Sequence, residues 1–132
     1  MAKILTISDA AFIALHGVIL VARSENNFNV RHIAEETGMS RHHVAKVMQR
    51  LVKDNILTSS RGPNGGFVLK RKPEEITFLE IFESIEGKIE VADCPLDKKI
   101  CKFGLCIFNN ITSKMTLQFK NYLAEQTLDK YL

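Results

Sequence analysis

The sequence predicts a mainly α-helical protein that carries one small β-ribbon. Three observations support this fold class: helical spacing of apolar residues over 30–53, two short strand patterns around a glycine-rich turn over 56–70, and a long helical repeat over 105–132. We therefore expect a helical domain with a ribbon at its edge, followed by a long C-terminal helix.

Length and composition are those of a folded domain with a core of its own. The chain has 132 residues, of which 45% are hydrophobic and 25% are charged, so it can bury a core without disulfide bonds. No leader pattern begins the sequence, and the apolar run over 10–22 is too short to cross a bilayer. We expect a cytoplasmic protein with no membrane partner.

The net charge of +3 is unevenly distributed along the chain. Residues 1–72 contain 11 lysines and arginines against 5 acids, whereas residues 73–132 contain 7 against 10. Within 41–72 there are 8 basic residues and one acid, Asp54. Such a block suits a surface that faces phosphates, although by itself it is equally typical of a solvated basic face.

The first helix is predicted from a capping box and an apolar sequence. Thr6 and Asp9 have capping-box spacing, which predicts a helix that ends near Ala22 and is followed by a polar connection over 24–28. Apolar residues lie on most sides of this helix, so we expect it to be buried, partly in a subunit interface. These residues are Phe12, Ile13, Leu15, Val18, Ile19 and Val21.

Two further helices form a predicted helix-turn-helix. Asn29 can cap a helix over 30–37, Gly38 supplies the turn, and Ser40 caps a third helix over 41–53. The third helix has an apolar stripe at helical spacing, Val44, Val47, Met48 and Leu51. Its other face carries donors suited to phosphates and guanine edges, as in a recognition helix. These donors are Arg41, His42, His43, Lys46, Gln49, Arg50 and Lys53.

A glycine-rich tip follows the predicted recognition helix. Strands over 56–60 and 67–70 flank the sequence Arg61-Gly62-Pro63-Asn64-Gly65-Gly66. The three glycines allow positive φ, and so lean a backbone can approach a sugar–phosphate wall, with Arg61 available for the minor groove. We expect Arg61, Asn64 and Gly65 to contact DNA as the wing of a winged helix-turn-helix; the alternative is a plain hairpin turn.

The C-terminal half is predicted to hold two more helices and a loop. Pro73 ends the ribbon, and Thr77 with Glu80 forms a capping box for a helix through Glu86, with Leu79, Phe82 and Ile85 inward. Residues 88–106 form a loop. From about residue 105 to 132 the pattern is helical, about 39 Å long at ~1.5 Å per residue. Its heptad-like stripe, which we expect to meet a partner helix, is Phe108, Ile111, Met115, Phe119 and Tyr122.

All three cysteines of the chain lie in this loop. Cys94, Cys101 and Cys106 have C-x6-C-x4-C spacing, which is not that of a zinc ribbon or a dithiol oxidoreductase. Thiolates are soft ligands that suit clustered iron. Pro95 and Gly104 allow a loop that brings the cysteines together, and the interleaved lysines Lys98, Lys99 and Lys102 would lower the thiol pKa values. The alternatives are three buried thiols and a zinc site with a fourth ligand.

The chain resembles the Rrf-two superfamily of bacterial winged-helix regulators. The resemblance includes the cysteine loop and the last helix, and it extends along essentially the whole chain. The runs that carry it are Thr37-Gly38-Met39-Ser40-Arg41 with Val44 and Leu51, then Arg61-Gly62-Pro63-Asn64-Gly65-Gly66-Phe67-Val68-Leu69, and Pro73-Glu74-Glu75-Ile76-Thr77. The combination of this wing with three clustered cysteines makes the resemblance specific.

The resemblance implies a DNA-binding repressor controlled by an iron–sulfur cluster. It implies a homodimer that crosses its long C-terminal helices and binds a palindromic double-stranded DNA operator, with the recognition helices ~34 Å apart. It also implies that the cysteines hold a 4Fe-4S or 2Fe-2S cluster, which senses nitric oxide, redox state or cluster supply. We expect three parts: a DNA-binding domain over 1–87, a cluster loop over 88–106, and a dimerisation helix over 107–132.

Three cysteines leave one iron position for another ligand. Some members of the superfamily use a histidine after the third cysteine, but none follows here. In the nitric-oxide-responsive branch an aspartate at the start of the first helix reaches across from the other subunit, and Asp9 matches that position. Asp9 is also explained as a helix-capping acid, and Ala10 and Ile13 depart from the aromatic and arginine often found there. His16 is either a reserve ligand or a core histidine.

Two other functions are compatible with the residues. A cluster-free regulator would use the cysteines as a thiol redox switch, and a metal or cluster carrier would use the winged domain for protein contact alone. An enzyme is not expected, because no nucleophile–base pair, cofactor fingerprint or paired-carboxylate pattern stands out.

Overall fold

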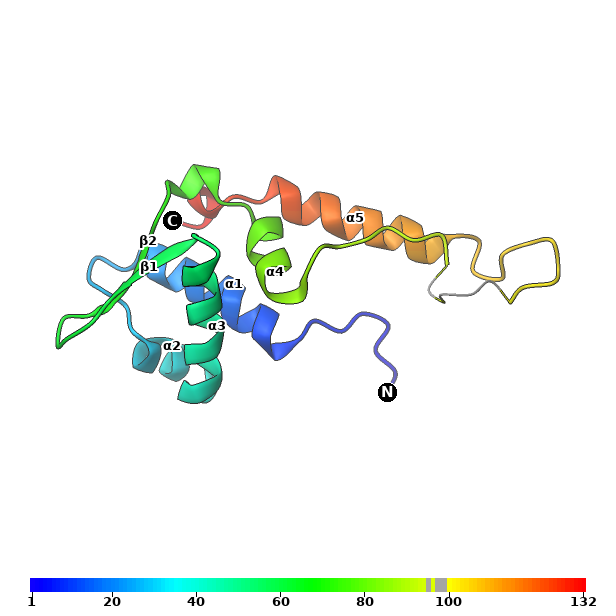
Figure 1. The fold of residues 1–132 in the computed structure, drawn as a ribbon. Helices are drawn as coiled ribbons and strands as arrows, with labels where there is room; N and C mark the ends of the chain where they lie inside the picture. The colour runs from blue at the N-terminus through cyan, green and yellow to red at the C-terminus, as the bar shows by residue number, and fades with distance from the viewer. Residues whose placement is uncertain (95, 97–99) are drawn as a thin grey trace.

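The computed structural model describes residues 1–94, 96 and 100–132. It confirms the mainly helical fold with one small antiparallel ribbon (Figure 1). In chain order the elements are α1 (Asp9–Arg23), α2 (Val30–Thr37), α3 (Arg41–Lys53), β1 (Leu57–Ser60), β2 (Gly66–Leu69), the short 3-10 helix η1 (Pro73–Glu75), α4 (Phe78–Glu86), α5 (Ile111–Glu125) and the 3-10 helix η2 (Leu128–Tyr131).

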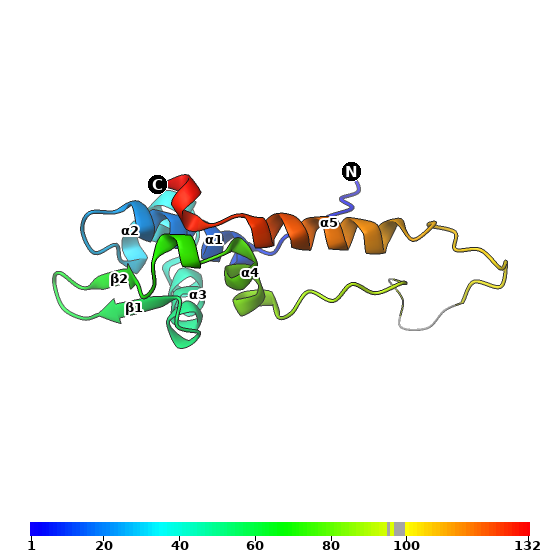
Figure 2. The same cartoon turned by 90° about the horizontal axis from the view of Figure 1, so that it is seen from above.

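The molecule has a winged head and an arm. The head is formed by α1 to α4 with the ribbon, and the ribbon projects from the end of the head opposite the arm (Figures 1 and 2). The arm consists of the described residues of 88–110 and the first half of α5, and it extends away from the head. No helix in the described part of the chain is long and apolar enough to cross a membrane.

The core lies where α1 packs against α3 and α4. Ile13 and Val18 of α1 are fully buried, as are Met48 and Leu51 of α3, whose predicted apolar stripe is confirmed. Gly17 allows the two helices to approach closely, because a Cβ there would lie 3.0 Å from the Met48 Sδ atom. Phe12 is exposed in the single chain, so one side of this helix faces out of the head, and its expected burial in a subunit interface stays a prediction.

The helix-turn-helix has the predicted boundaries and caps. The Asn29 side chain accepts a hydrogen bond from the His32 N–H, and Gly38 ends α2 with φ of 71°. The Ser40 Oγ accepts from the His43 N–H at 3.1 Å and begins α3. These side chains satisfy N–H groups that have no partner inside their helices. The first helix differs, because Ser8 and not Thr6 is its N-cap, with Oγ accepting from the Ala11 N–H.

The ribbon is a two-stranded antiparallel sheet with a third contact that the sequence did not indicate. Leu57 pairs with Leu69 and Ser60 with Gly66, each strand lying within a residue of the predicted bounds. Phe28, expected in a polar connection, forms a bridge with Phe67 and accepts a hydrogen bond from the Phe67 N–H at 2.9 Å. This contact attaches the ribbon to the segment between α1 and α2.

The helix α4 is confirmed, but its buried face was predicted one position away from where it lies. Thr77 caps it and Gly87 ends it with φ of 87°. Phe78 and Ile81 are buried, whereas the predicted inward residues, Leu79, Phe82 and Ile85, are half-buried and pack around the core. Neighbouring helices thus cover a larger share of the α4 surface than a single inward stripe would imply.

The prediction of a single C-terminal helix from about residue 105 to 132 was wrong in extent. The helix α5 spans 15 residues, and the preceding Asn109 and Asn110 have positive φ, which α-helical residues do not adopt. Gln126 leaves the helix in an extended conformation, and its carbonyl accepts from the Phe78 N–H at 2.9 Å. The chain then forms η2, whose Leu128 is fully buried. The segment after α5 therefore pairs with the start of α4 instead of continuing the helix.

Candidate nucleic-acid interface and cysteine site

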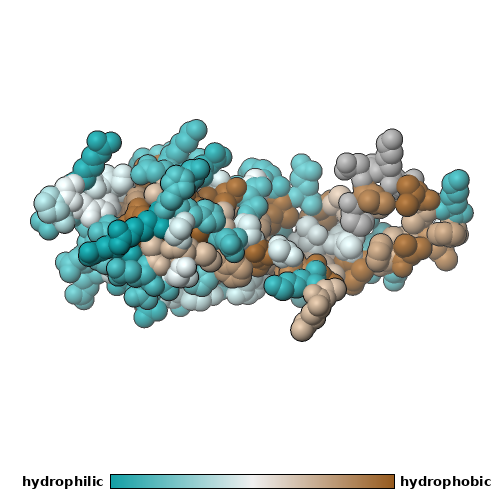
Figure 3. Space-filling model, turned by 90° about the horizontal axis from the view of Figure 1, so that it is seen from below, coloured by the Kyte–Doolittle hydropathy of each residue, from teal (hydrophilic) through white to brown (hydrophobic). Residues whose placement is uncertain are grey.

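The outer face of α3 presents the predicted recognition residues. Because the stripe of Val44, Val47, Met48 and Leu51 is buried against the head, the opposite face turns outward. The candidate residues Ser40, Arg41, His42, Lys46 and Arg50 are exposed, and His43 is half-buried. Figure 3 shows the head largely covered by hydrophilic side chains. The structure therefore brings the predicted basic and donor side chains onto one helix surface.

Two of these recognition residues also serve the protein's own structure. Ser40 caps α3, as described above, so its hydroxyl has a structural role before any contact with a ligand. The Arg50 Nε lies 3.3 Å from the Asp54 Oδ2, one helical turn further along the chain. Arg50 therefore has to share or leave Asp54 in order to contact a phosphate, whereas Arg41 and Lys46 form no ion pair within the described part of the chain.

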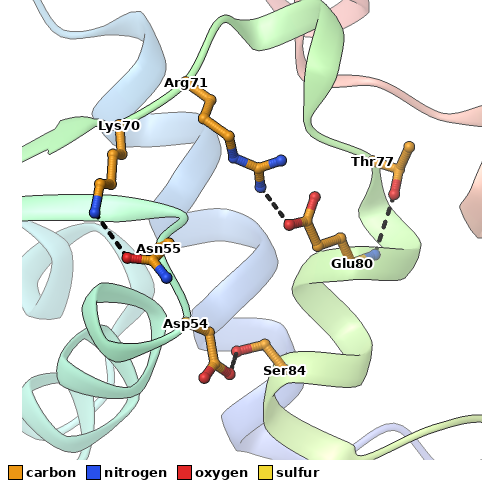
Figure 4. Close-up of polar contacts among 7 residues, drawn as sticks. All are labelled: Asp54, Asn55, Lys70, Arg71, Thr77, Glu80 and Ser84. Carbon is orange, nitrogen blue, oxygen red and sulfur yellow. Dashed lines mark hydrogen bonds and ion pairs between the residues drawn. The ribbon is translucent and has the colours of Figure 1, made fainter.

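A polar network joins the end of α3 to the ribbon and to α4 (Figure 4). The Ser84 hydroxyl of α4 donates to the Asp54 Oδ2, and the Lys70 Nζ donates to the Asn55 Oδ1 at 2.7 Å. Arg71, just after β2, pairs with Glu80 of α4. The hydrogen bond from Ser84, followed by the charge of Arg50, lowers the pKa of Asp54, and partial burial opposes this shift.

The wing tip is exposed and tightly turned. Arg61 and Asn64 are exposed, and the Gly65 N–H donates to the Gly62 carbonyl at 2.9 Å. Of the three glycines, which all allow positive φ, Gly62 adopts it, at 101°. Gly65 and Gly66 are required for space instead, because a Cβ on Gly65 would lie 2.5 Å from the Ser60 carbonyl oxygen. The tip therefore needs its glycines, but Gly65 and Gly66 are needed to avoid close contacts and not to adopt positive φ.

His32 has a role that the sequence did not indicate. It is half-buried, and its Nδ1 accepts from the Asn29 N–H at 3.2 Å. Its ring also packs on Phe28, with centroids 4.9 Å apart. The spacing of an Asn and a residue with a side-chain acceptor three positions later could have predicted this reciprocal cap.

The cysteines lie at the far end of the arm, and the structure brings all three together. Cys94, Cys101 and Cys106 line a cavity of about 230 Å³, together with Asp93, Gly104, Leu105 and Asn110. The same three residues line an adjoining cavity of about 190 Å³, whose other lining residues are apolar: Leu96, Ile100, Phe103, Ile107 and Phe108. Cys94 is half-buried, and Cys101 and Cys106 are exposed. The expected loop thus gathers the thiols beside an apolar surface.

The donors around these two cavities are three thiols. Within residues 1–94, 96 and 100–132, no three or more histidine, cysteine or acidic side chains are arranged to hold one metal ion. An iron–sulfur cluster distributes its thiolate ligands over several iron atoms, so they need not converge on one point. Three sulfurs around shared cavities match that requirement. Lys102 lies beside them and is exposed, whereas Pro95, Lys98 and Lys99 lie outside the described residues.

The candidate fourth ligand is not in this group. Asp9 is exposed at the start of α1 in the head and lines neither cysteine cavity. His16 is also exposed, so its interpretation as a core histidine is wrong; its Nδ1 lies 2.8 Å from the Phe12 carbonyl oxygen. Figures 1 and 2 show the start of α1 well separated from the end of the arm. Ligation by Asp9 therefore requires a second subunit.

A family model matches residues 7–132 of the chain, that of Rrf2, described as an iron-dependent transcriptional regulator. The HTH-type transcriptional regulator NsrR of Bacillus subtilis is 30% identical over 105 residues, which cover 78% of this chain and 68% of that protein. The chain spans 64% of the length of another curated relative and 56% of a third, so it aligns with only part of those proteins.

Solved structures with the same fold cover nearly the whole chain. CymR, the global cysteine regulator of B. subtilis, superposes with a TM-score of 0.77 at 24% identity, over 96% of this chain and 95% of that chain. IscR of T. potens superposes with a TM-score of 0.71 at 21% identity, over 95% and 84%. At these identities the superpositions show the shared fold: a winged head with a helical extension.

Proposed function

The chain belongs to the Rrf2 family of transcriptional regulators, and we propose that it is a DNA-binding repressor controlled by an iron–sulfur cluster. In this proposal the thiolates of Cys94, Cys101 and Cys106 hold the cluster, and its state sets the affinity of a homodimer for its operator. The observation that carries the proposal is the shared lining of two adjoining cavities by all three cysteines.

The surroundings of the cysteines suit an anionic, water-sensitive group. Apolar side chains, among them Ile100, Phe103 and Phe108, line one of the two cavities, and a second copy of the chain that covered them would limit the access of water. Lys102 can offset negative charge on the thiolates. When bound, a cluster would supply iron that responds to oxidants and nitric oxide at this end of the arm. The chain itself contributes the three thiolates and their apolar cover.

DNA binding is assigned to α3 and the wing. Arg41 and Lys46 on α3 and Arg61 on the wing are exposed at sites that a duplex can reach. Arginine and lysine in the major groove read guanine edges, and contacts to phosphates add affinity that falls with salt. The proposed contacts are those of Ser40, Arg41, His42, His43, Lys46, Arg50, Arg61, Asn64 and Gly65.

The arm suits the interface of a homodimer. Its apolar side chains include Ile100, Phe103 and Leu105, which are 69%, 73% and 78% exposed in the single chain. Figure 3 shows hydrophobic side chains gathered over the arm. A monomer seldom exposes so continuous an apolar surface. A second copy of the chain would cover it, and Asp9 of that copy could then approach the cysteine cavities as the fourth ligand.

A chain of contacts connects the cysteine loop to α3. At the base of the arm, the Ile89 N–H donates to the Glu83 Oε2 at 2.7 Å, and the Lys120 Nζ donates to the Ile89 carbonyl at 3.2 Å. Ser84, the next residue of α4, donates to Asp54 at the end of α3. A rearrangement of the loop would thus act on α4 first and on the recognition helix next.

The cluster is tested by anaerobic purification, visible absorption, and iron and sulfide analysis. We expect a brown protein, and we expect Cys94→Ala, Cys101→Ala and Cys106→Ala to lose iron and sulfide while keeping the helical circular dichroism spectrum. A changed spectrum in Asp9→Ala would support the fourth-ligand assignment. Unchanged iron and sulfide content in the cysteine variants would refute the cluster assignment.

DNA binding is tested with a duplex that the wild-type protein selects from a random-sequence pool. At fixed salt we expect Arg61→Ala to weaken binding about tenfold, the effect of losing one charged contact of ~1.4 kcal/mol. Lys88→Ala, an exposed cation at the base of the arm, is the matched control. Equal affinity of Arg61→Ala and wild type would refute the wing assignment.

The exposure of Cys101 and Cys106 favours a second candidate, a cluster-free thiol switch. It predicts a colourless protein after anaerobic reconstitution that loses DNA binding on mild oxidation. A metal or cluster carrier, the third candidate, predicts no salt-sensitive binding to any duplex. The two experiments above separate all three.

A further inference from the structure

We propose that Asn27 is a positioning residue for the wing: its side-chain amide holds the tip in the orientation that presents Arg61 to DNA. This inference rests on the DNA-binding function proposed above and adds to it a residue outside both the helix-turn-helix and the wing. The observation behind it is a hydrogen bond between segments far apart in the sequence: the Asn27 Nδ2 donates to the Asn64 carbonyl at 2.5 Å.

The wing needs an external support because the ribbon is small. Each strand has four residues, and two-stranded ribbons are marginally stable by themselves. The tip from Arg61 to Asn64 is exposed, and the backbone of Gly62 has little steric restriction because glycine lacks a Cβ. Pairing within the ribbon leaves its direction relative to α3 undetermined. Contacts from outside the ribbon must therefore fix where Arg61 points.

Two contacts from the α1–α2 connection supply this support. The Phe28 carbonyl accepts from the Phe67 N–H at the base of the wing, at 2.9 Å, and Phe67 is buried. Asn27, one residue earlier, reaches the tip at Asn64. Gly66 lies between these two points, and a Cβ there would lie 2.9 Å from the Phe28 carbonyl oxygen and 3.0 Å from the Asn27 Cβ. The connection therefore lies directly against the wing.

The same connection is attached to the helix-turn-helix on its other side. Asn29 caps α2 together with His32, and the His32 ring packs against Phe28. Residues 27–29 thus bridge the wing tip, the wing base and the start of α2. A cavity of about 580 Å³ opens beside this bridge, with Asn27, Arg31, Asn64 and Gly65 in its lining. Of the two hydrogen bonds between this connection and the wing, the one made by Asn27 depends on a side chain, so a substitution can remove it with the backbone unchanged.

Substituting Asn27 with Ala removes the amide while leaving the buried core untouched, because Asn27 is exposed. We expect binding of the selected duplex to weaken about three- to tenfold, the range for loss of one hydrogen bond. Asn26→Ala is the matched control, because Asn26 takes part through its backbone carbonyl, which accepts from the Ser24 Oγ. Loss of one hydrogen bond should lower the melting temperature of Asn27→Ala by no more than about 6 °C, and Asn26→Ala should melt like the wild type.

A double-mutant cycle with Arg61 tests whether Asn27 acts through the wing. In the Arg61→Ala background we expect Asn27→Ala to change affinity less than twofold, because the group that it positions is gone. The same loss in both backgrounds would refute the positioning role, as would a full-affinity Asn27→Ala variant. If the wild type binds no duplex, the proposed function fails as well. If the wild type binds and Asn27→Ala binds with the same affinity, only the positioning role of Asn27 fails.

A second measurement needs no DNA. Trypsin can cleave after Arg61 when the tip opens, and mass spectrometry gives the rate of cleavage at that bond. We expect Asn27→Ala to accelerate this cleavage about three- to tenfold, in parallel with its loss of affinity, and Asn26→Ala to leave it unchanged. An unchanged rate in Asn27→Ala would overturn the inference.

Discussion

Ser84 on α4 donates a hydrogen bond to the Asp54 Oδ2 at 2.5 Å, and the same oxygen accepts from the Arg50 Nε on α3 at 3.3 Å. One carboxylate thus joins the recognition helix to the helix from which the arm departs (Figure 4). The hydrogen bond from Ser84 is the largest contribution to the lowered pKa of Asp54, followed among the lowering effects by the charge of Arg50. The position of α4 therefore affects both the pKa of Asp54 and the availability of Arg50.

This relationship gives a pH-dependent prediction for Ser84→Ala. Because the pKa of Asp54 is lower in the folded protein than in the unfolded chain, its stabilisation is present above the unfolded pKa. It is lost as the pH falls through the folded pKa. We expect Ser84→Ala to reduce the free energy of unfolding by about 1 kcal/mol at pH 7 and by less below about pH 4.

Urea unfolding at both pH values measures the difference, with Ser59→Ala, on an exposed strand position, as the control. A destabilisation by Ser84→Ala that is equal at the two pH values would show that Ser84 acts through packing and not through the Asp54 charge.

Gly66→Ala tests the close contact between the wing and the α1–α2 connection. The new Cβ would lie 2.9 Å from the Phe28 carbonyl oxygen, so the connection must move. We expect a loss of stability of about 1–3 kcal/mol, typical of overpacking, and weaker binding of the selected duplex. Val68→Ala, on the exposed side of the same strand, is the control. A wild-type melting temperature for Gly66→Ala would contradict this steric argument.

Phe119 and Met115 lie on the same predicted stripe of α5 but have different surroundings. Phe119 is half-buried and packs edge-on against Phe82 of α4, with ring centroids 5.6 Å apart, whereas Met115 is exposed. We expect Phe119→Ala to lower the free energy of unfolding of the monomeric fold by about 2–3 kcal/mol. Met115→Ala should instead weaken the homodimer.

Sedimentation equilibrium and chemical unfolding, each as a function of protein concentration, separate the two effects. A concentration-dependent loss in Phe119→Ala and none in Met115→Ala would reverse the assignment of these two residues.

Leu128 attaches the end of the chain to the head. It is fully buried, and its N–H donates to the Ile76 carbonyl at 3.1 Å. We expect Leu128→Ala to cost about 2–5 kcal/mol, as for other large-to-small changes in a core, with the melting temperature as the measurement. Leu132→Ala, at an exposed position, should have little effect. Equal effects of the two changes would show that η2 does not anchor the chain.

Local signals in the sequence predicted most of the head. Caps at Asn29 and Ser40, the turn at Gly38 and the stripe of α3 are interactions within a few residues, so short-range physical rules suffice for them. The family resemblance and the gathering of the cysteines in one loop were also indicated by the residues themselves. Asp9 as a fourth ligand stays a prediction, because a single chain places it away from the cysteines.

Contacts between distant segments were not predictable in the same way. Phe28 was expected in a polar connection but pairs with Phe67, and Asn27 reaches Asn64 across 37 positions of sequence. The freedom of glycine to adopt positive φ was the expected reason for Gly66, whereas the α1–α2 connection leaves no room there for a side chain. Spacing along one segment carries no information about what packs against it.

By itself, the sequence determined the order of the elements, the exposed basic face of α3 and the cysteine-bearing loop, because caps, periodicity and clustered residue types act locally. Only the tertiary structure decided where the last helix ends and which of its apolar residues stay exposed. The Phe78 N–H binds the Gln126 carbonyl, and Leu128 enters the core. Both contacts compensate for the helical hydrogen bonds that are given up, and both join segments far apart in the sequence.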